Sequence, residues 1–93
     1  MKKLSTKEIK KLNELKSIDK LLKIIDILRN PLNGCPWDLK QDYMSLSDYP
    51  IEESYELQNA IENKDINNIK EELGDLLLQI VLLSQIGKEN NDF

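Results

Sequence analysis

The sequence predicts an all-α fold, a helical bundle that a second copy of the chain completes. Apolar residues recur every three or four positions over much of the chain, and only three glycines and three prolines interrupt its 93 residues. The strongest repeat comprises Ile66, Ile69, Leu73, Leu76, Ile80 and Leu83. Residues 76–83 are apolar nearly all round a helix, and the other helices of one small chain are too few to cover them, so dimerisation is expected.

The first two helices are predicted from their capping residues. Ser5 and Glu8 have the spacing of a capping box, which opens a short helix. Ser17 can cap a second helix, whose apolar residues recur at helical spacing as far as Leu28. Residues 30–38 are expected to form a tight loop, because two prolines and a glycine deny them regular hydrogen bonds.

Two longer helices are expected in the second half of the chain. One runs from Ser45 or Pro50 to Asn63, and Pro50 either occupies its first turn or marks a kink. Asp65 can cap the other, which continues to about Lys88. Because the connection between them is short, the two helices should be antiparallel.

Composition excludes several classes of protein. The net charge of −4 argues against a nucleic-acid-binding protein, and no stretch approaches the roughly 20 apolar residues that a membrane helix needs. Cys35 is the only cysteine, which fits a reducing compartment, so we expect a soluble, cytoplasmic chain with no membrane partner. Histidine is absent, so any chemistry must use carboxylates, hydroxyls, lysines or metal-bound water.

Two acidic groups lie on the predicted antiparallel helices. They are Glu52, Glu53 and Glu56 in EESYE, then Glu71, Glu72 and Asp75 in EELGD. If the apolar faces of the two helices meet, four of these carboxylates come close together, where their charges repel and burial is costly. A divalent cation would relieve both effects, and all-oxygen ligation favours Mg²⁺, with Mn²⁺ or Ca²⁺ as alternatives. Solvated helix faces are the other interpretation, and spacing alone does not choose between them.

The residues LRNPLNGCPWDLKQ, SLSDYPIEESYELQNAI and EELGDLLLQIVL resemble the MazG-type nucleoside triphosphate pyrophosphohydrolases over about residues 18–88. We therefore expect a MazG-like domain over residues 18–93 and an N-terminal helical extension over residues 1–17. The resemblance implies a bundle whose dimerising helices build the active site, as a homodimer or a dimer of dimers. It also implies Mg²⁺-dependent hydrolysis of an NTP or dNTP to a nucleoside monophosphate and pyrophosphate.

The resemblance also implies roles for individual residues. The metal ligands would be Glu53, Glu56, Glu72 and Asp75, and the catalytic residues would be Glu52, which orients the attacking water, and the ligand Glu53. Contacts to the substrate would come from Tyr49, Glu52, Asn68 and Glu71.

Two further substrate contacts are expected nearer the N-terminus. Trp37 is either a packing anchor for its loop or a neighbour of the substrate base. The second contact is Lys40. Relatives usually continue with another helix and a basic segment, which residues 18–93 lack. The possible substitutes for those basic groups are Lys40, Lys64 and Lys70, and the other interpretation is that all three are surface lysines. The alternative function is a weakly active or inactive helical module that binds metal or another protein.

Overall fold

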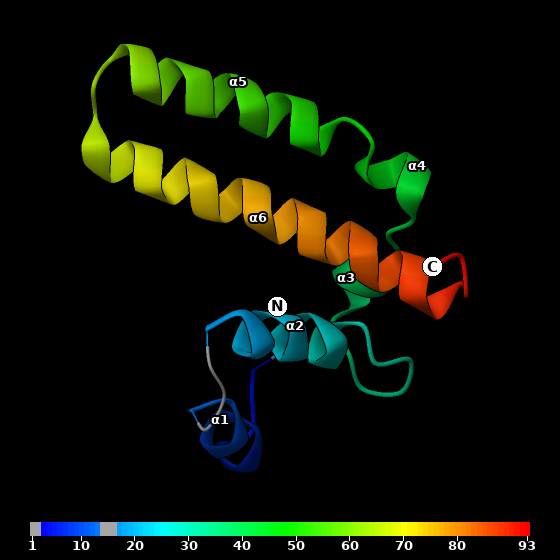
Figure 1. Cartoon of the computed structure of the whole chain (residues 1–93). Helices are drawn as coiled ribbons and strands as arrows, with labels where there is room; N and C mark the ends of the chain where they lie inside the picture. The colour runs from blue at the N-terminus through cyan, green and yellow to red at the C-terminus, as the bar shows by residue number, and fades with distance from the viewer. Residues whose placement is uncertain (1–2, 14–16) are drawn as a thin grey trace. The chain divides into compact units, whose positions relative to one another are not determined.

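The computed structural model describes residues 3–13 and 17–93, and every regular element in these ranges is a helix, which confirms the all-α fold class. The helices are α1 (Thr6–Asn13), α2 (Ser17–Leu28), α3 (Pro36–Leu39), α4 (Tyr43–Leu46), α5 (Tyr49–Glu62) and α6 (Ile66–Glu89) (Figure 1). They form two compact units, residues 1–41 and residues 42–93. No helix in the described ranges is long and apolar enough to cross a membrane.

The first unit contains α1, α2 and α3. The predicted capping box is confirmed at α1: the Ser5 amide donates to Glu8 Oε1 at 2.9 Å, and the Glu8 amide donates to Ser5 Oγ at 3.1 Å. Helix α2 begins at Ser17 itself and buries Ile25, Ile27 and Leu28. The apolar periodicity of this segment therefore supplies the core of the unit.

The segment after α2 is only partly the loop that the sequence predicted. A tight turn does follow α2, and a Cβ on Gly34 would collide with the carbonyl oxygens of Leu28 and Asn30, so only glycine fits. The expectation was wrong at the end of the segment, where α3 begins at Pro36. A proline in the first turn of a helix costs no hydrogen bond, because amides there have no partner within the helix.

Arg29 attaches α3 to the end of α2. Its Nη1 donates to the carbonyl oxygens of Asp38 and Gln41, the second at 3.0 Å. These carbonyls belong to the last turn of α3 and the residues just after it, where a cation also interacts favourably with the helix dipole.

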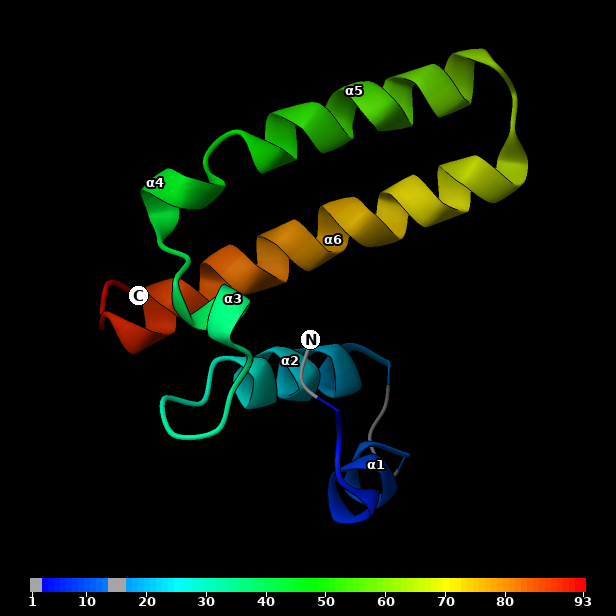
Figure 2. The same cartoon turned by 180° about the vertical axis from the view of Figure 1, so that it is seen from behind.

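The second unit is a helical hairpin preceded by a short helix. Helices α5 and α6 are antiparallel and pack along their length (Figures 1 and 2), as the short connection predicted. Pro50 occupies the first turn of α5, so it starts this helix and does not kink it. Asp65 caps α6 as predicted, since its carboxylate accepts a hydrogen bond from the Asn68 amide at 3.2 Å. Lys64, with φ 54°, makes the turn between the two helices.

The far end of α6 is held by contacts from α4 and from the C-terminal residues. Tyr43 donates its hydroxyl hydrogen to Asp92 Oδ2 at 2.8 Å, and the ring of Phe93 lies against Gly87, where any Cβ would collide with it. The unit buries Leu46, Ala60, Val81, Leu82 and Ile86. Several other apolar residues of α6 stay exposed, among them Leu77 and Ile80.

Candidate metal centre

Three glutamates meet where α5 faces α6. Glu53 and Glu56 lie one turn apart on α5, and Glu72 lies on α6. One ligand oxygen from each carboxylate lies within 4.8 Å of one ligand oxygen from each of the others. The one-turn spacing on α5 gives the two side chains a common face, and the antiparallel pairing brings the third to it.

The arrangement is unfavourable for three carboxylates alone. Glu53 Oε2 and Glu72 Oε2 are buried and accept no hydrogen bond from any group in the described ranges. Buried polar atoms without a partner are uncommon in folded proteins and each destabilises the fold. The two oxygens are therefore suited to a ligand that the chain itself does not provide.

The electrostatics of the cluster indicate the same need. The pKa of Glu56 is raised, first because its protonated form can donate a hydrogen bond to the Glu72 carboxylate, then by the Glu72 charge and by desolvation. The pKa of Glu72 is also raised, chiefly because its protonated form can donate a hydrogen bond to Glu53 and then by desolvation, while a hydrogen bond with Glu56 acts in the opposite direction. Asp75 raises the pKa of both glutamates through its charge. Mutual repulsion thus favours protons, or a cation, in this cluster.

The donor set fits a hard divalent cation. All the converging atoms are carboxylate oxygens, and no histidine or cysteine is among them, which favours Mg²⁺ over the softer transition metals. Of the four predicted ligands, the structure brings Glu53, Glu56 and Glu72 together. The Asp75 carboxylate lies outside the 4.8 Å group, although it is near enough to act on both neighbouring pKa values.

The other predicted site residues on the hairpin lie around this cluster in the sequence. Glu52 precedes Glu53 and raises the pKa of Glu56 by its charge. Tyr49 is the first residue of α5 and is partly exposed; Asn68 and Glu71 lie in the first two turns of α6. Asn68 is half-buried and Glu71 is exposed.

Trp37 and Lys40 belong to the first unit. The Trp37 side chain is 52% exposed, so the structure does not make it a buried packing anchor, and its carbonyl oxygen accepts from Gln41 Nε2 at 2.9 Å. Lys40 is exposed and ends α3. Both side chains are accessible to a ligand.

A polar residue that the sequence analysis did not single out is Gln79. Its Oε1 is the third buried side-chain oxygen without a partner in the described ranges, after those of Glu53 and Glu72. The signal in the sequence was a single glutamine within the apolar run of residues 76–83.

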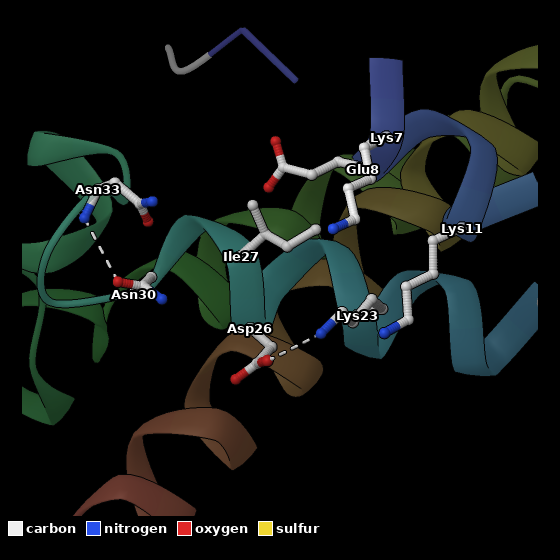
Figure 3. A pocket seen from close by; sticks show the side chains of 8 residues that line it. All are labelled: Lys7, Glu8, Lys11, Lys23, Asp26, Ile27, Asn30 and Asn33. Atoms are coloured by element: carbon white, nitrogen blue, oxygen red, sulfur yellow. Dashed lines mark hydrogen bonds and ion pairs between the residues drawn. The ribbon is translucent and has the colours of Figure 1, made fainter. Parts of the chain in front are cut away.

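The first unit contains a separate hollow of about 260 Å³ (Figure 3). Its lining residues come from α1, α2 and the following turn: Lys7, Glu8, Lys11, Lys23, Asp26, Ile27, Asn30 and Asn33. Lys23 and Asp26 form an ion pair across 3.6 Å on α2. The hollow shares no residue with the glutamate cluster.

Comparison with known proteins identifies the family of this chain. The family sequence model of the MazG nucleotide pyrophosphohydrolase domain matches residues 41–93, which include the whole hairpin and all three glutamates of the cluster. The chain belongs to this family. The resemblance seen in the sequence motifs is therefore confirmed.

Individual relatives agree with the family match. The chain is 43% identical over 79 residues to the nucleoside triphosphate pyrophosphohydrolase of Escherichia coli K12, an alignment that covers 85% of the chain and 30% of the relative. It is 49% identical over 75 residues to the nucleoside triphosphate pyrophosphohydrolase/pyrophosphatase MazG of Thermotoga maritima, covering 81% and 29%. It is 54% identical over 70 residues to the uncharacterized protein YabN of Bacillus subtilis, covering 75% and 14%. The chain thus spans less than a third of the length of these relatives.

Proposed function

We propose that this chain is a Mg²⁺-dependent nucleoside triphosphate pyrophosphohydrolase, which converts an NTP or dNTP to a nucleoside monophosphate and pyrophosphate. The observation that carries the proposal is the glutamate cluster: three carboxylates meet on facing helices, and two of their buried oxygens have no partner in the described ranges. The activities after which the Escherichia coli and Thermotoga maritima relatives are named support the reaction class.

In this proposal Glu53, Glu56 and Glu72 hold the cation, with Asp75 as the fourth carboxylate. When bound, the cation neutralises phosphate charge and lowers the pKa of a coordinated water. Glu52 and Glu53 are the carboxylates that orient the attacking water. Phosphoryl transfer depends mainly on positioning and on charge neutralisation, which a rigid helical hairpin supplies without histidine.

Substrate contacts are proposed for each unit by itself. On the hairpin, Tyr49, Asn68 and Glu71 contact the nucleotide, together with Glu52. On the first unit, the exposed Trp37 ring can stack on a base and Lys40 can pair with a phosphate. The base and sugar preferences follow from which of these contacts form.

The proposal includes self-association, as a homodimer or a dimer of dimers. Leu73, Leu77 and Ile80 recur along one face of α6 and are 52%, 42% and 52% exposed. A second copy of the same surface would remove this stripe from water, as the apolar run in the sequence predicted.

The test incubates the purified chain with each NTP and dNTP in Mg²⁺ and identifies the products, while melting curves are recorded with Mg²⁺ and with EDTA. The proposal predicts monophosphate plus pyrophosphate and a Mg²⁺-dependent rise in melting temperature, because the ion binds the folded cluster and not the unfolded chain. Diphosphate plus phosphate would contradict the reaction. Mg²⁺ stabilisation without turnover would support the alternative, a metal-binding interaction module.

A further inference from the structure

Three buried side-chain oxygens in the described ranges have no hydrogen-bond partner, and all three lie on the α5–α6 hairpin. Two belong to Glu53 and Glu72, whose partner is the proposed cation. The third is Gln79 Oε1, to which the proposed reaction assigns no role. Because buried polar atoms are nearly always paired, this oxygen also needs a partner from beyond the described residues.

The helical register directs Gln79 toward the glutamate cluster. Gln79 follows Glu72 by seven residues, about two helical turns, so the two side chains leave the same face of α6. Long side chains on a helix lean over the turn that precedes them, which for Gln79 is the turn of Asp75. The carboxamide therefore extends from its own position toward the acidic end of this face.

The hairpin also places Gln79 near the proposed substrate contacts. Tyr49 and Gln79 are each fifteen residues from Lys64, which makes the turn. Antiparallel helices with the same rise per residue thus put Gln79 level with the first turn of α5. Figures 1 and 2 agree, since the start of α5 lies beside the orange part of α6.

We infer that Gln79 Oε1 accepts a hydrogen bond from an O–H group that arrives with the ligand of the glutamate cluster. The group is either a water bound to the cation or a sugar hydroxyl of the nucleotide. A neutral carboxamide suits this position, because it accepts such a hydrogen bond without adding a further negative charge beside the phosphates. The inference rests on the proposed function and makes Gln79 a positioning residue.

The test compares Gln79→Met, which removes the acceptor at similar length, with Gln79→Glu, which restores an acceptor. Gln58→Met is the matched control, because Gln58 is an exposed glutamine on α5. Mg²⁺ affinity is measured from melting curves without nucleotide, and kcat and KM are measured with ribo-, 2′-deoxy- and 2′,3′-dideoxynucleoside triphosphates of one base.

If the donor is a cation-bound water, Gln79→Met weakens Mg²⁺ binding about tenfold without nucleotide, as is usual for a residue that hydrogen-bonds a metal's ligands. If the donor is a sugar hydroxyl, Mg²⁺ affinity is unchanged and KM rises about tenfold for the nucleotides that carry that hydroxyl. In the first case Gln79→Glu keeps the parental Mg²⁺ affinity or exceeds it. In the second case its added charge raises KM for all three nucleotides alike, so the parental differences between them are kept. Gln58→Met behaves as the parent does in both cases.

A Gln79→Met variant that keeps the parental Mg²⁺ affinity and the parental KM for all three nucleotides overturns the inference. So does a variant that changes only the sedimentation coefficient, since the partner of Oε1 would then be a second copy of the chain. A parent that shows neither Mg²⁺ stabilisation nor turnover overturns the proposed function itself, which separates the two failures.

Discussion

At the scale of single residues, Glu53 combines a structural cost with a proposed role. Its Oε2 is buried without a hydrogen-bond partner among the described residues, and its carboxyl group lies close to those of Glu72 and Glu56. A substitution that removes the charge and keeps the shape should therefore affect stability and metal binding in opposite directions, as is common where a site is built at the expense of the fold.

We expect Glu53→Gln to leave the metal-free protein as stable as the parent or slightly more stable, because one of three converging charges is gone. The same change should weaken Mg²⁺ binding and reduce hydrolysis sharply, because an anionic ligand is lost. Urea unfolding in EDTA, Mg²⁺ titration and product analysis measure the three quantities. Glu62→Gln, on an exposed glutamate of the same helix, is the control and should alter none of them. Full Mg²⁺-dependent turnover in Glu53→Gln would refute the assigned cluster.

The raised pKa values of Glu56 and Glu72 predict a pH dependence of the metal-free protein. A carboxyl group whose pKa in the folded protein lies above its ordinary value of 4.5 stabilises the fold when it is protonated. This stabilisation is fully present below pH 4.5 and is lost as the pH rises through the folded-state pKa. The free energy of unfolding of Glu72→Gln, which cannot ionise, should therefore exceed that of the parent increasingly as the pH rises.

Urea unfolding of the parent and of Glu72→Gln in EDTA, from about pH 4 to about pH 8, measures this difference across the ordinary carboxyl range. Saturating Mg²⁺ should reverse the order at the upper end, because the parent binds the ion more tightly. A difference that stays constant with pH would show that the cluster does not repel its own charges.

At the scale of the elements, the two long helices begin with the same residue type in different geometry. Asp65 accepts a hydrogen bond from the Asn68 amide, whereas the Asp48 side chain makes no capping hydrogen bond at the start of α5. Both carboxylates lie at helix N-termini and gain from the helix dipole. They differ in backbone conformation, extended at Asp65 and helical at Asp48, and in the capping hydrogen bond.

We expect Asp65→Ala to lower the free energy of unfolding by about 1 kcal/mol more than Asp48→Ala does, which is the usual contribution of a side-chain cap. Chemical unfolding of the two variants and the parent provides the measurement. Equal losses in the two variants would mean that the dipole, and not the cap, stabilises the start of α6.

At the scale of the whole molecule, Leu73, Leu77 and Ile80 form an exposed apolar stripe on α6. The proposed explanation is a second copy of the chain. A charge at the centre of the stripe should prevent self-association, because a carboxylate would be buried in an apolar contact without a partner.

Leu77→Asp should therefore convert an associated protein to a monomer at micromolar concentration, with its helix content retained because Leu77 is already partly exposed in the single chain. Sedimentation velocity and circular dichroism test this. Leu32→Asp, on a turn residue that is 95% exposed, should not change the association state. A parent that sediments only as a compact monomer would refute self-association through any surface.

Local features were readable from the sequence because they depend on neighbours a few residues apart. The capping box at Ser5 and Glu8 and the Asp65 cap each follow from contacts within one turn. The same is true of the i, i+3 spacing that pairs Glu53 with Glu56. The sequence left two positions open for Pro50, and the structure selects the first turn of α5. The wrong prediction of a loop at the start of α3 shows the limit of such local prediction. The sequence does not distinguish a proline in the first turn of a helix from a proline in a loop, and tertiary contacts such as those of Arg29 select one of the two.

The sequence by itself determined the all-α class, the antiparallel hairpin and the acidic residues that border its apolar faces. The tertiary structure decided that the oxygens of Glu53, Glu56 and Glu72 converge while that of Asp75 lies outside. It also decided that Gln79 has a buried oxygen with no partner in residues 3–13 and 17–93. These outcomes depend on how far each helix is rotated about its own axis. That rotation is set by packing between α5 and α6, around buried residues such as Ala60, and not by the spacing of residues along either helix.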